Sequence, residues 1–222
     1  MGFNWRILAG TRDMYLDGLL VTILYSIVAI IIAVLWGILI GSINFRRVKG
    51  LSLITRAYTT FFRETPLLVQ IYFWFYGLSR IMPVSASVIG VMALVFNDGA
   101  FIAEIVRGGL QSIDRGQEEA AYSLGFSKSQ TLFYFLIPQA VRKTQDSIMN
   151  MVSIIIKDTS LLMWITITEL TYVAHRVNSK FYQPITAYLT AAAFYFTLFL
   201  IVQGIKKLMD RRAEKKNGLI AT

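Results

Sequence analysis

The side chains best suited to chemistry in this sequence are charged groups embedded in apolar segments. Asp98 and Glu104 lie in one such segment and Lys157 lies in another. Charged groups are costly in hydrocarbon, so they usually face a protein interior or a water-filled path, where they can meet a polar solute. With no cysteine and a single histidine, His175, the sequence offers no thiolate chemistry, and we expect no metal site.

Helical spacing determines which embedded groups share a face. Asn97 and Glu104 are seven residues apart, about 20° around a regular helix, with Phe101 between them. Asp98 and Glu104 lie about 120° apart, so both contact one solute only if Gly99 distorts the helix. A polar stripe within about 80° of arc on the other segment comprises Asn150, Ser153, Lys157 and Ser160.

Two interpretations of these groups stay open. Asp98 and Glu104 can favour the ammonium group of a solute, whereas Lys157 can pair with one of them, or with Asp158, purely to neutralise itself. We favour direct solute contact for Glu104 and structural pairing for Lys157. The candidate residues of a transport path are Asn97, Asp98, Phe101, Glu104, Lys157 and Ser160.

The composition excludes an ordinary soluble enzyme. Of the 222 residues, 55% are apolar and 16% are charged, against about 25% charged in soluble domains. Two long runs, from Gly18 to Phe45 and from Phe181 to Ile205, contain no charged side chain. Since about 20 helical residues cross the hydrocarbon layer, each run is long enough to span a membrane.

Together with three further apolar segments, these runs predict an all-α membrane protein with five transmembrane helices in a single domain, residues 1–222. Sixteen of the 22 Lys and Arg residues fall on one side of the spans, which makes that side cytoplasmic. The N-terminus is then outside, the C-terminus is cytoplasmic, and the net charge of +9 reflects topology rather than nucleic-acid binding. The expected spans are about 18–45, 59–79, 86–106, 147–168 and 184–206.

Small residues mark a packing face in the first span. Ala33, Gly37 and Gly41 repeat every four residues and therefore share one side of the helix. Small residues at this spacing let another backbone approach closely. We interpret this face as a contact within the protein's own helical bundle; self-association through it has no separate support.

The long cytoplasmic loop, about 107–146, is predicted to form two short helices. Asp114 can cap the first, with Gln117 three residues on, and Gly125 can close it in the left-handed conformation. Such a structured loop suits docking into a groove on another protein. An amphipathic surface hairpin with no partner is an equally good interpretation.

The second loop helix has its own start and stop signals. Ser127 and Gln130 form a capping box before the apolar run 132–137, and we expect Pro138 to end this helix.

At these residues the sequence resembles the permease subunits of ABC importers. Their EAA signature is EAA, three residues, Gly, nine residues, then I-x-L-P. The chain has Glu119-Ala120-Ala121, then Gly125, then Phe135-Leu136-Ile137-Pro138. Four further stretches are similar to the branch that imports polar amino acids, the histidine/glutamine/arginine type: GLLVT (18–22), FRETPLLVQ (62–70), AEIVRGG (103–109) and KDTSL (157–161). The resemblance covers about residues 15–210.

The resemblance implies a multi-pass protein of the bacterial cytoplasmic (inner) membrane that forms a translocation path for polar amino acids. Its implied partners are cytoplasmic ABC ATPase subunits, a second permease subunit, identical or homologous, and an extracytoplasmic solute-binding protein. ATP and Mg would bind the ATPase, since this sequence contains no G-x-x-x-x-G-K-[ST] loop; we therefore expect no enzyme activity and no cofactor on this chain.

The resemblance also assigns roles in the loop. Glu119 would be a charged contact to the ATPase, Ala120 and Ala121 would allow close approach, and Gly125 would set the angle between the helices, with Pro138 closing the motif. The alternative is a secondary transporter of amino acids, driven by an ion gradient through Asp98, Glu104 and Lys157. A non-transporting membrane scaffold is a third possibility.

Overall fold

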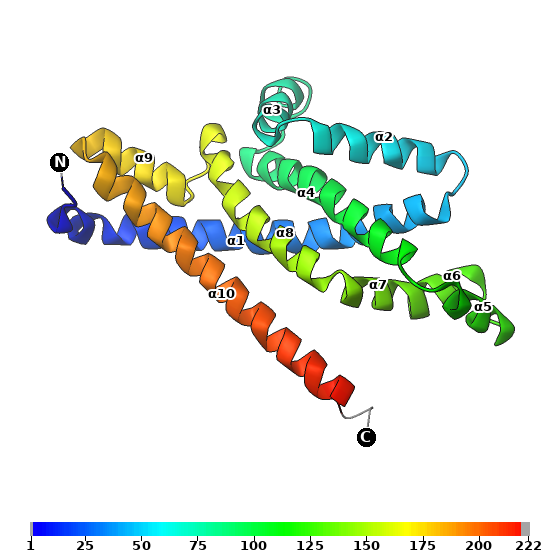
Figure 1. Cartoon of the computed structure of the whole chain (residues 1–222). Coiled ribbons are helices and arrows are strands. Elements are labelled where there is room, and N and C mark those ends of the chain that lie inside the picture. The colour runs from blue at the N-terminus through cyan, green and yellow to red at the C-terminus, as the bar shows by residue number, and fades with distance from the viewer. Residues whose placement is uncertain (1, 219–222) are drawn as a thin grey trace. The chain divides into compact units, whose positions relative to one another are not determined.

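A computed structural model describes the backbone of residues 2–218 and the side chains of residues 2–211; all regular secondary structure in this described part is helical, without a strand. The predicted all-α class is confirmed (Figure 1). The elements are α1 (Trp5–Arg46), α2 (Leu51–Glu64), α3 (Leu67–Tyr72), η1 (Phe73–Leu78), α4 (Ala86–Gln111), α5 (Arg115–Ser123), α6 (Lys128–Gln130), η2 (Thr131–Leu136), α7 (Ile137–Lys143), α8 (Gln145–Asp158), η3 (Thr159–Ile165), α9 (Leu170–Phe181) and α10 (Pro184–Gly218).

Four described helical segments are long and apolar enough to cross a membrane. They are Trp5–Arg46, Ala86–Gln111, Gln145–Ile165 and Pro184–Arg211. They correspond to four of the five expected spans, although the first begins at Trp5, well before the expected start at Gly18. The third runs from α8 straight into the tighter turns of η3 and stops at Thr166, whose φ is 65°. The chain is therefore a multi-pass membrane protein.

The segment expected to form the span 59–79 is interrupted. Thr65 and Pro66 are both extended, with ψ of 141° and 131°. Proline disfavours helical backbone at the residue before it, so α2 ends at Glu64 and a new helix starts at Leu67. The segment Leu67–Leu78 rises only about 18 Å as a helix, short of the roughly 30 Å hydrocarbon core. Five continuous spans thus remain a prediction.

The chain divides into two compact units, which are described separately. Unit 1 comprises residues 1–26 and 152–222, and unit 2 comprises residues 27–151.

The core of unit 1 forms where α9 and the start of α10 pack together (Figure 1). Tyr15 is 1% exposed, and its hydroxyl donates to the Ala187 carbonyl at 2.8 Å. Gly18 lies so close to α9 that a Cβ there would be 2.8 Å from the Val173 side chain. The Leu170 amide donates to the Thr22 hydroxyl at 3.2 Å, which fixes the beginning of α9 against α1.

In unit 2, the later part of α1 packs against α4 through the predicted small-residue face. A Cβ on Gly37 would meet the Ile102 side chain at 2.5 Å, and one on Gly41 would meet the Ala103 carbonyl oxygen at 2.5 Å. Ala33 is fully buried. The prediction of a packing face within the protein is therefore confirmed, and only glycine allows this approach at positions 37 and 41.

Helix α2 packs along α4 on the other side of unit 2 (Figure 1). Trp36 donates its ring N–H to the Tyr58 hydroxyl at 2.9 Å, and that hydroxyl donates to the Phe96 carbonyl at 2.7 Å. The three rings pack edge to face. This chain of bonds links α1, α2 and α4. It therefore helps to fix the position of α4, the helix that carries several candidate residues of the transport path.

Candidate functional site

The first candidate site is the loop hairpin, residues 114–143, whose first helix has the predicted ends. The Asp114 carboxylate accepts the Gly116 amide at 2.7 Å, so Asp114 caps α5, although it does so without a capping box to Gln117. Gly125 has a φ of 85°. The amides of Phe126 and Gly125 donate to the carbonyls of Ala121 and Tyr122 at 3.1 and 2.9 Å, the two bonds of a Schellman motif. The left-handed stop at Gly125 is confirmed.

The second half of the loop hairpin begins as predicted but does not end as predicted. Ser127 and Gln130 form both bonds of the capping box. Pro138, expected to end the helix, instead stands near the start of α7, which continues to Lys143. A π-helical stretch, η2, precedes it, and the Ile137 amide reaches back five residues to the Leu132 carbonyl. The wider turn accommodates a residue that lacks an N–H, which is how the helix passes through the proline.

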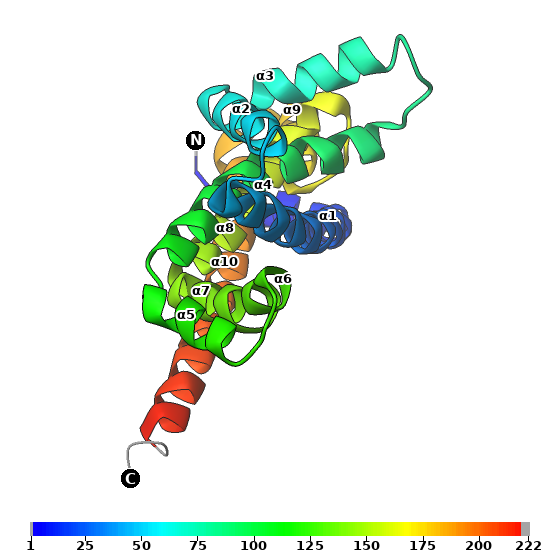
Figure 2. The ribbon, with the colours of Figure 1, turned by 90° about the vertical axis from the view of Figure 1, so that its right-hand side faces the viewer.

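The residues of the EAA signature in the loop hairpin differ in their exposure to solvent. Glu119, Ala120, Gly125 and Pro138 are exposed, whereas Ala121 is 3% exposed and packs inside the hairpin. The helices α5 and α6 both pack on η2, and Figure 2 shows them close together. Ala121 therefore supports the hairpin from within and does not offer a contact surface.

The hairpin also exposes large apolar side chains that the sequence analysis did not single out. These are Leu124, Phe133 and Tyr134.

A guanidinium joins the loop hairpin to the end of α1. Arg46 donates to the Glu118 carboxylate and, through its other terminal nitrogen, to the Lys128 carbonyl at 3.0 Å. The Tyr122 hydroxyl donates to the same Glu118 oxygen at 2.5 Å. This hydrogen bond from Tyr122, followed by the hydrogen bond and positive charge of Arg46, holds the pKa of Glu118 below its usual value. We call Arg46, Glu118, Tyr122 and Lys128 the Arg46 clamp.

The sequence analysis missed the Arg46 clamp. Its only local signal was the spacing of Glu118 and Tyr122, one helical turn apart; Arg46 is 72 residues from Glu118. The clamp fixes both helices of the hairpin to the first long apolar helix, because Glu118 lies on α5 and Lys128 begins α6.

The second candidate site is the set of polar residues on α4. Asn97 is buried, and its side-chain amide donates to the Phe62 carbonyl at 2.9 Å, which satisfies one of the carbonyls at the end of α2. Asp98 is 1% exposed. Both residues are thus enclosed within unit 2, and Asn97 holds α2 against α4.

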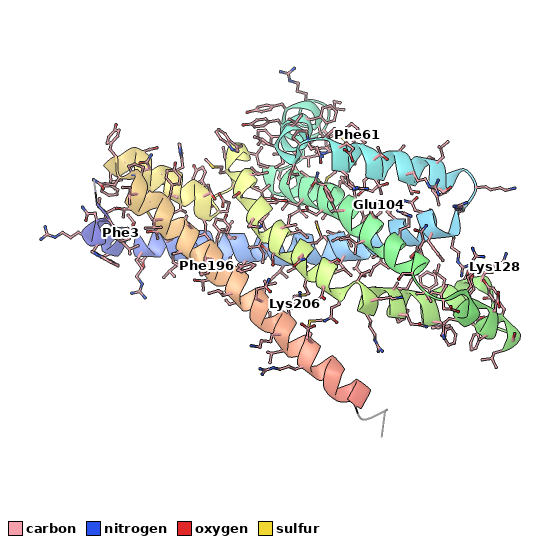
Figure 3. All side chains as sticks on the ribbon, viewed as in Figure 1. Phe3, Phe61, Glu104, Lys128, Phe196 and Lys206 are labelled. Carbon is pink, nitrogen blue, oxygen red and sulfur yellow. The ribbon has the colours of Figure 1, made fainter. Side chains whose placement is uncertain are left out.

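Glu104, labelled in Figure 3, is half-buried farther along α4. Two arginines lie close to its carboxylate. One of its oxygens accepts the Arg107 Nε at 2.9 Å and Nη2 at 2.7 Å. The same oxygen lies 3.9 Å from the Arg63 Nη1. The Arg63 guanidinium also lies over the Phe101 ring, 5.5 Å from its centroid. We call Arg63, Phe101, Glu104 and Arg107 the arginine cluster.

The sequence analysis named Phe101 and Glu104 but counted both arginines only toward the topology. The pairing of Glu104 with Arg107 was readable from their i, i+3 spacing on a helix. The approach of Arg63 depends on the packing of α2 against α4 and has no local signal.

The third candidate site, in unit 1, is a cavity of about 520 Å³ between α8, η3, α9 and α10. Its lining includes Lys157 and Ser160 together with Ser153 from the predicted stripe. Lys157 is exposed and forms no ion pair within the described part of unit 1. Aromatic rings of α10 complete the walls; they are Tyr188, Tyr195, Phe196 and Phe199.

Behind this cavity lies a buried carboxylate that the sequence analysis missed. Glu169 is fully buried and accepts the amides of Thr171 and Tyr172 at 2.8 and 2.7 Å, which caps α9. The Tyr195 hydroxyl donates to it at 2.6 Å. Burial raises the pKa of Glu169 above its usual value despite these bonds. Glu169 preceding a helix was the available signal, since acidic residues favour helix N-termini.

Comparison with known proteins gives a consistent result over most of the chain. Residues 29–215 match the family described as binding-protein-dependent transport system inner membrane component. The chain is 35% identical over 188 residues to the probable glutamine ABC transporter permease protein GlnP of Bacillus subtilis (strain 168), covering 82% of this chain and 85% of that protein. It is 30% identical over 213 residues to the probable permease GlnM of the same organism, covering 96% and 99%.

A solved structure agrees with these sequences. The crystal structure of an amino acid ABC transporter with histidines contains a chain that superposes with a TM-score of 0.85 at 31% identity, covering 96% of this chain and all of that one.

Proposed function

We propose that this chain, which belongs to the family of binding-protein-dependent transport system inner membrane components, is the membrane-spanning permease subunit of an ATP-driven importer of polar amino acids. The observation that carries the proposal is the loop hairpin, because it presents the EAA signature on a capped, rigid pair of helices within a chain that resembles amino-acid permeases over most of its length. A scaffold that does not transport would not explain why the chain carries this hairpin.

The partners follow from the family. A separate ATPase supplies energy and holds ATP and Mg, a solute-binding protein delivers the amino acid outside the cell, and a second permease subunit completes the path. Bacillus subtilis has two related proteins, GlnP and GlnM, both with names of glutamine permeases. This supports a pair of permease subunits, identical or homologous.

In the proposed mechanism the loop hairpin lies on the cytoplasmic side and docks on the ATPase. Glu119 and Ala120 are exposed on α5, and Leu124 adds an apolar side chain at 76% exposure just before Gly125. An exposed apolar residue beside a charged one is typical of a protein interface with a polar rim.

Movement of the docked hairpin would reach the membrane through the Arg46 clamp. Arg46 binds α5 through Glu118 and the start of α6 through the Lys128 carbonyl, so the two helices cannot shift without pulling on α1. The transition between inward- and outward-facing states is then a rigid-body motion of packed helices.

The proposed path residues fall into two groups. Phe101 and Glu104 belong to the arginine cluster, with Asn97 and Asp98 buried on the same helix, and Lys157 and Ser160 line the cavity of unit 1. The structure supports a positioning role for Asn97, whose amide is bonded to the end of α2.

The test is reconstitution. The chain is co-expressed with an ATPase and a solute-binding protein from the same organism, purified, and inserted in liposomes, and uptake of radiolabelled L-glutamine and L-histidine is measured. We expect co-purification of the ATPase and uptake that requires ATP. Uptake driven by an ion gradient without the ATPase would instead support a secondary transporter, and stable assembly without uptake of any amino acid would support a scaffold.

A further inference from the structure

The Arg63 side chain contacts two residues, and both lie on α4. It lies in the last turn of α2, and its guanidinium is placed by the Phe101 ring beneath it and by Glu104 at 3.9 Å. Its Nε is shielded from solvent and has no hydrogen-bond partner among the side chains and backbone that the structure describes. An unmatched donor of this kind costs free energy, which an incoming acceptor can recover if the side chain turns toward it.

The charges of the arginine cluster do not cancel. Glu104 is the single carboxylate, and Arg107 already binds it with two nitrogens at 2.7 and 2.9 Å. Arg63 approaches the same oxygen only at 3.9 Å, beyond hydrogen-bond distance. Since a guanidinium is always charged in proteins, the cluster holds one positive charge in excess.

The environment strengthens the attraction of that charge for an anion. The side chains of Arg63, Glu104 and Arg107 are 34%, 23% and 30% exposed, so they are partly removed from water but can still be reached. A guanidinium presents two parallel N–H donors that match the two oxygens of a carboxylate. The Phe101 ring attracts the guanidinium that lies over it and provides an apolar surface beside it.

We propose that Arg63 binds the α-carboxylate of the transported amino acid, and that Glu104 is a counter-ion of the arginine cluster rather than a ligand for the ammonium group. The proposal rests on the proposed function, because it assigns a solute contact to a residue of the path. The α-carboxylate is the part that all amino acids share, so Arg63 would retain the class of solute without selecting one side chain.

The experiment measures direct binding, because a solute-binding protein would impose its own selection. The permease–ATPase complex is purified in detergent without the binding protein, and binding of radiolabelled L-histidine is measured by equilibrium dialysis for the wild type and variants. Since a charged hydrogen-bonded pair is lost, Arg63→Gln should weaken binding by at least about 10-fold. Arg63→Lys should recover part of the affinity, because it keeps the charge but not the paired donors.

Two further variants make the result specific. Arg56→Gln removes the same charge from the same helix at an exposed position and should leave binding unchanged. Glu104→Gln removes the carboxylate that competes for Arg63 and should therefore raise the affinity above that of the wild type. Competition with histamine, which lacks the carboxylate, should be equally weak in the wild type and in Arg63→Gln.

The opposite pattern overturns the proposal: equal binding by the wild type and Arg63→Gln, or loss of binding in Glu104→Gln alone. Co-purification of the ATPase with each variant shows that the protein is folded and assembled. ATP-driven uptake by the wild-type assembly is measured in parallel. Its absence would count against the importer function, whereas normal uptake together with unaffected binding by Arg63→Gln would count against the role of Arg63 alone.

Discussion

Breaking the Arg46 clamp should loosen the loop hairpin without preventing its docking. The side chains of Arg46 and Glu118 are 20% and 26% exposed. The pair therefore lies between a surface ion pair, about 0.2–1 kcal/mol, and a charged hydrogen bond in the interior, about 1.5–3 kcal/mol. We expect a coupling energy of about 1–2 kcal/mol, which corresponds to a factor of about 5–30 in the equilibrium constant for local opening of α5.

A double-mutant cycle measures this energy. Amide hydrogen exchange of α5 is followed in the assembled complex for the wild type, Arg46→Gln, Glu118→Gln and the double variant. Either single change should accelerate exchange about 5- to 30-fold, and the second change should add little. The ATP hydrolysed per solute transported should rise in all three variants, because the hairpin then moves without pulling on α1.

Glu119→Gln is the matched control, since it removes a neighbouring exposed carboxylate that is not in the clamp. It should weaken ATPase docking and leave the coupling energy between Arg46 and Glu118 unchanged. If the effects of Arg46→Gln and Glu118→Gln were simply additive, the two side chains would not act as a pair and the reasoning would fail.

The clamp should also depend on pH in a defined direction. Because the pKa of Glu118 is lowered in the folded protein, its stabilisation is fully present above the usual value of 4.5 and is lost as the pH falls through the lower, folded-state value. Protection of α5 should thus be constant near neutral pH and decrease in acid, and Glu118→Gln should abolish this dependence.

Three further predictions concern single positions. Gly125→Ala should destabilise the hairpin by about 1–2 kcal/mol and accelerate the exchange of α5. A Cβ at this position would meet no atom within 4 Å, so the cost comes from the backbone strain of a non-glycine residue at a φ of 85°. Gly41→Ala should lower the thermal stability of the purified complex, since its Cβ would be 2.5 Å from a backbone oxygen, whereas Gly108→Ala, with nothing within 4 Å, should not. Tyr195→Phe should lower the stability by about 1–3 kcal/mol, because buried Glu169 loses a hydrogen bond. Unchanged exchange in Gly125→Ala, or an unchanged melting midpoint in Gly41→Ala or Tyr195→Phe, would contradict the stated cause.

Local chemistry made the helix ends predictable. Asp114, Ser127 and Gly125 each act within a few residues of their own position, so their capping roles could be read from the sequence and are confirmed. The packing face at Gly37 and Gly41 was equally readable, because a repeat of four residues fixes one side of a helix.

Interactions between distant segments could not be predicted in this way. The helix passes through Pro138 because η2 widens a turn whose side chains Thr131, Leu132 and Leu136 are buried, and burial is a tertiary property. Arg46 and Arg63 appeared only as positive charges near the ends of apolar runs, because their carboxylate partners lie on other helices, far away along the chain. The break at Pro66 was visible as a proline, but the apolar residues on both sides favoured one continuous span.

The most direct test of the account is solute accumulation by reconstituted permease in the presence of its ATPase, comparing the wild type with the double variant Glu119→Gln, Gly125→Pro. We expect ATP-dependent accumulation by the wild type and little or none by the variant, although both insert in the membrane in equal amounts. Accumulation at the wild-type rate by the double variant, or by the wild type with no ATPase present, would contradict it.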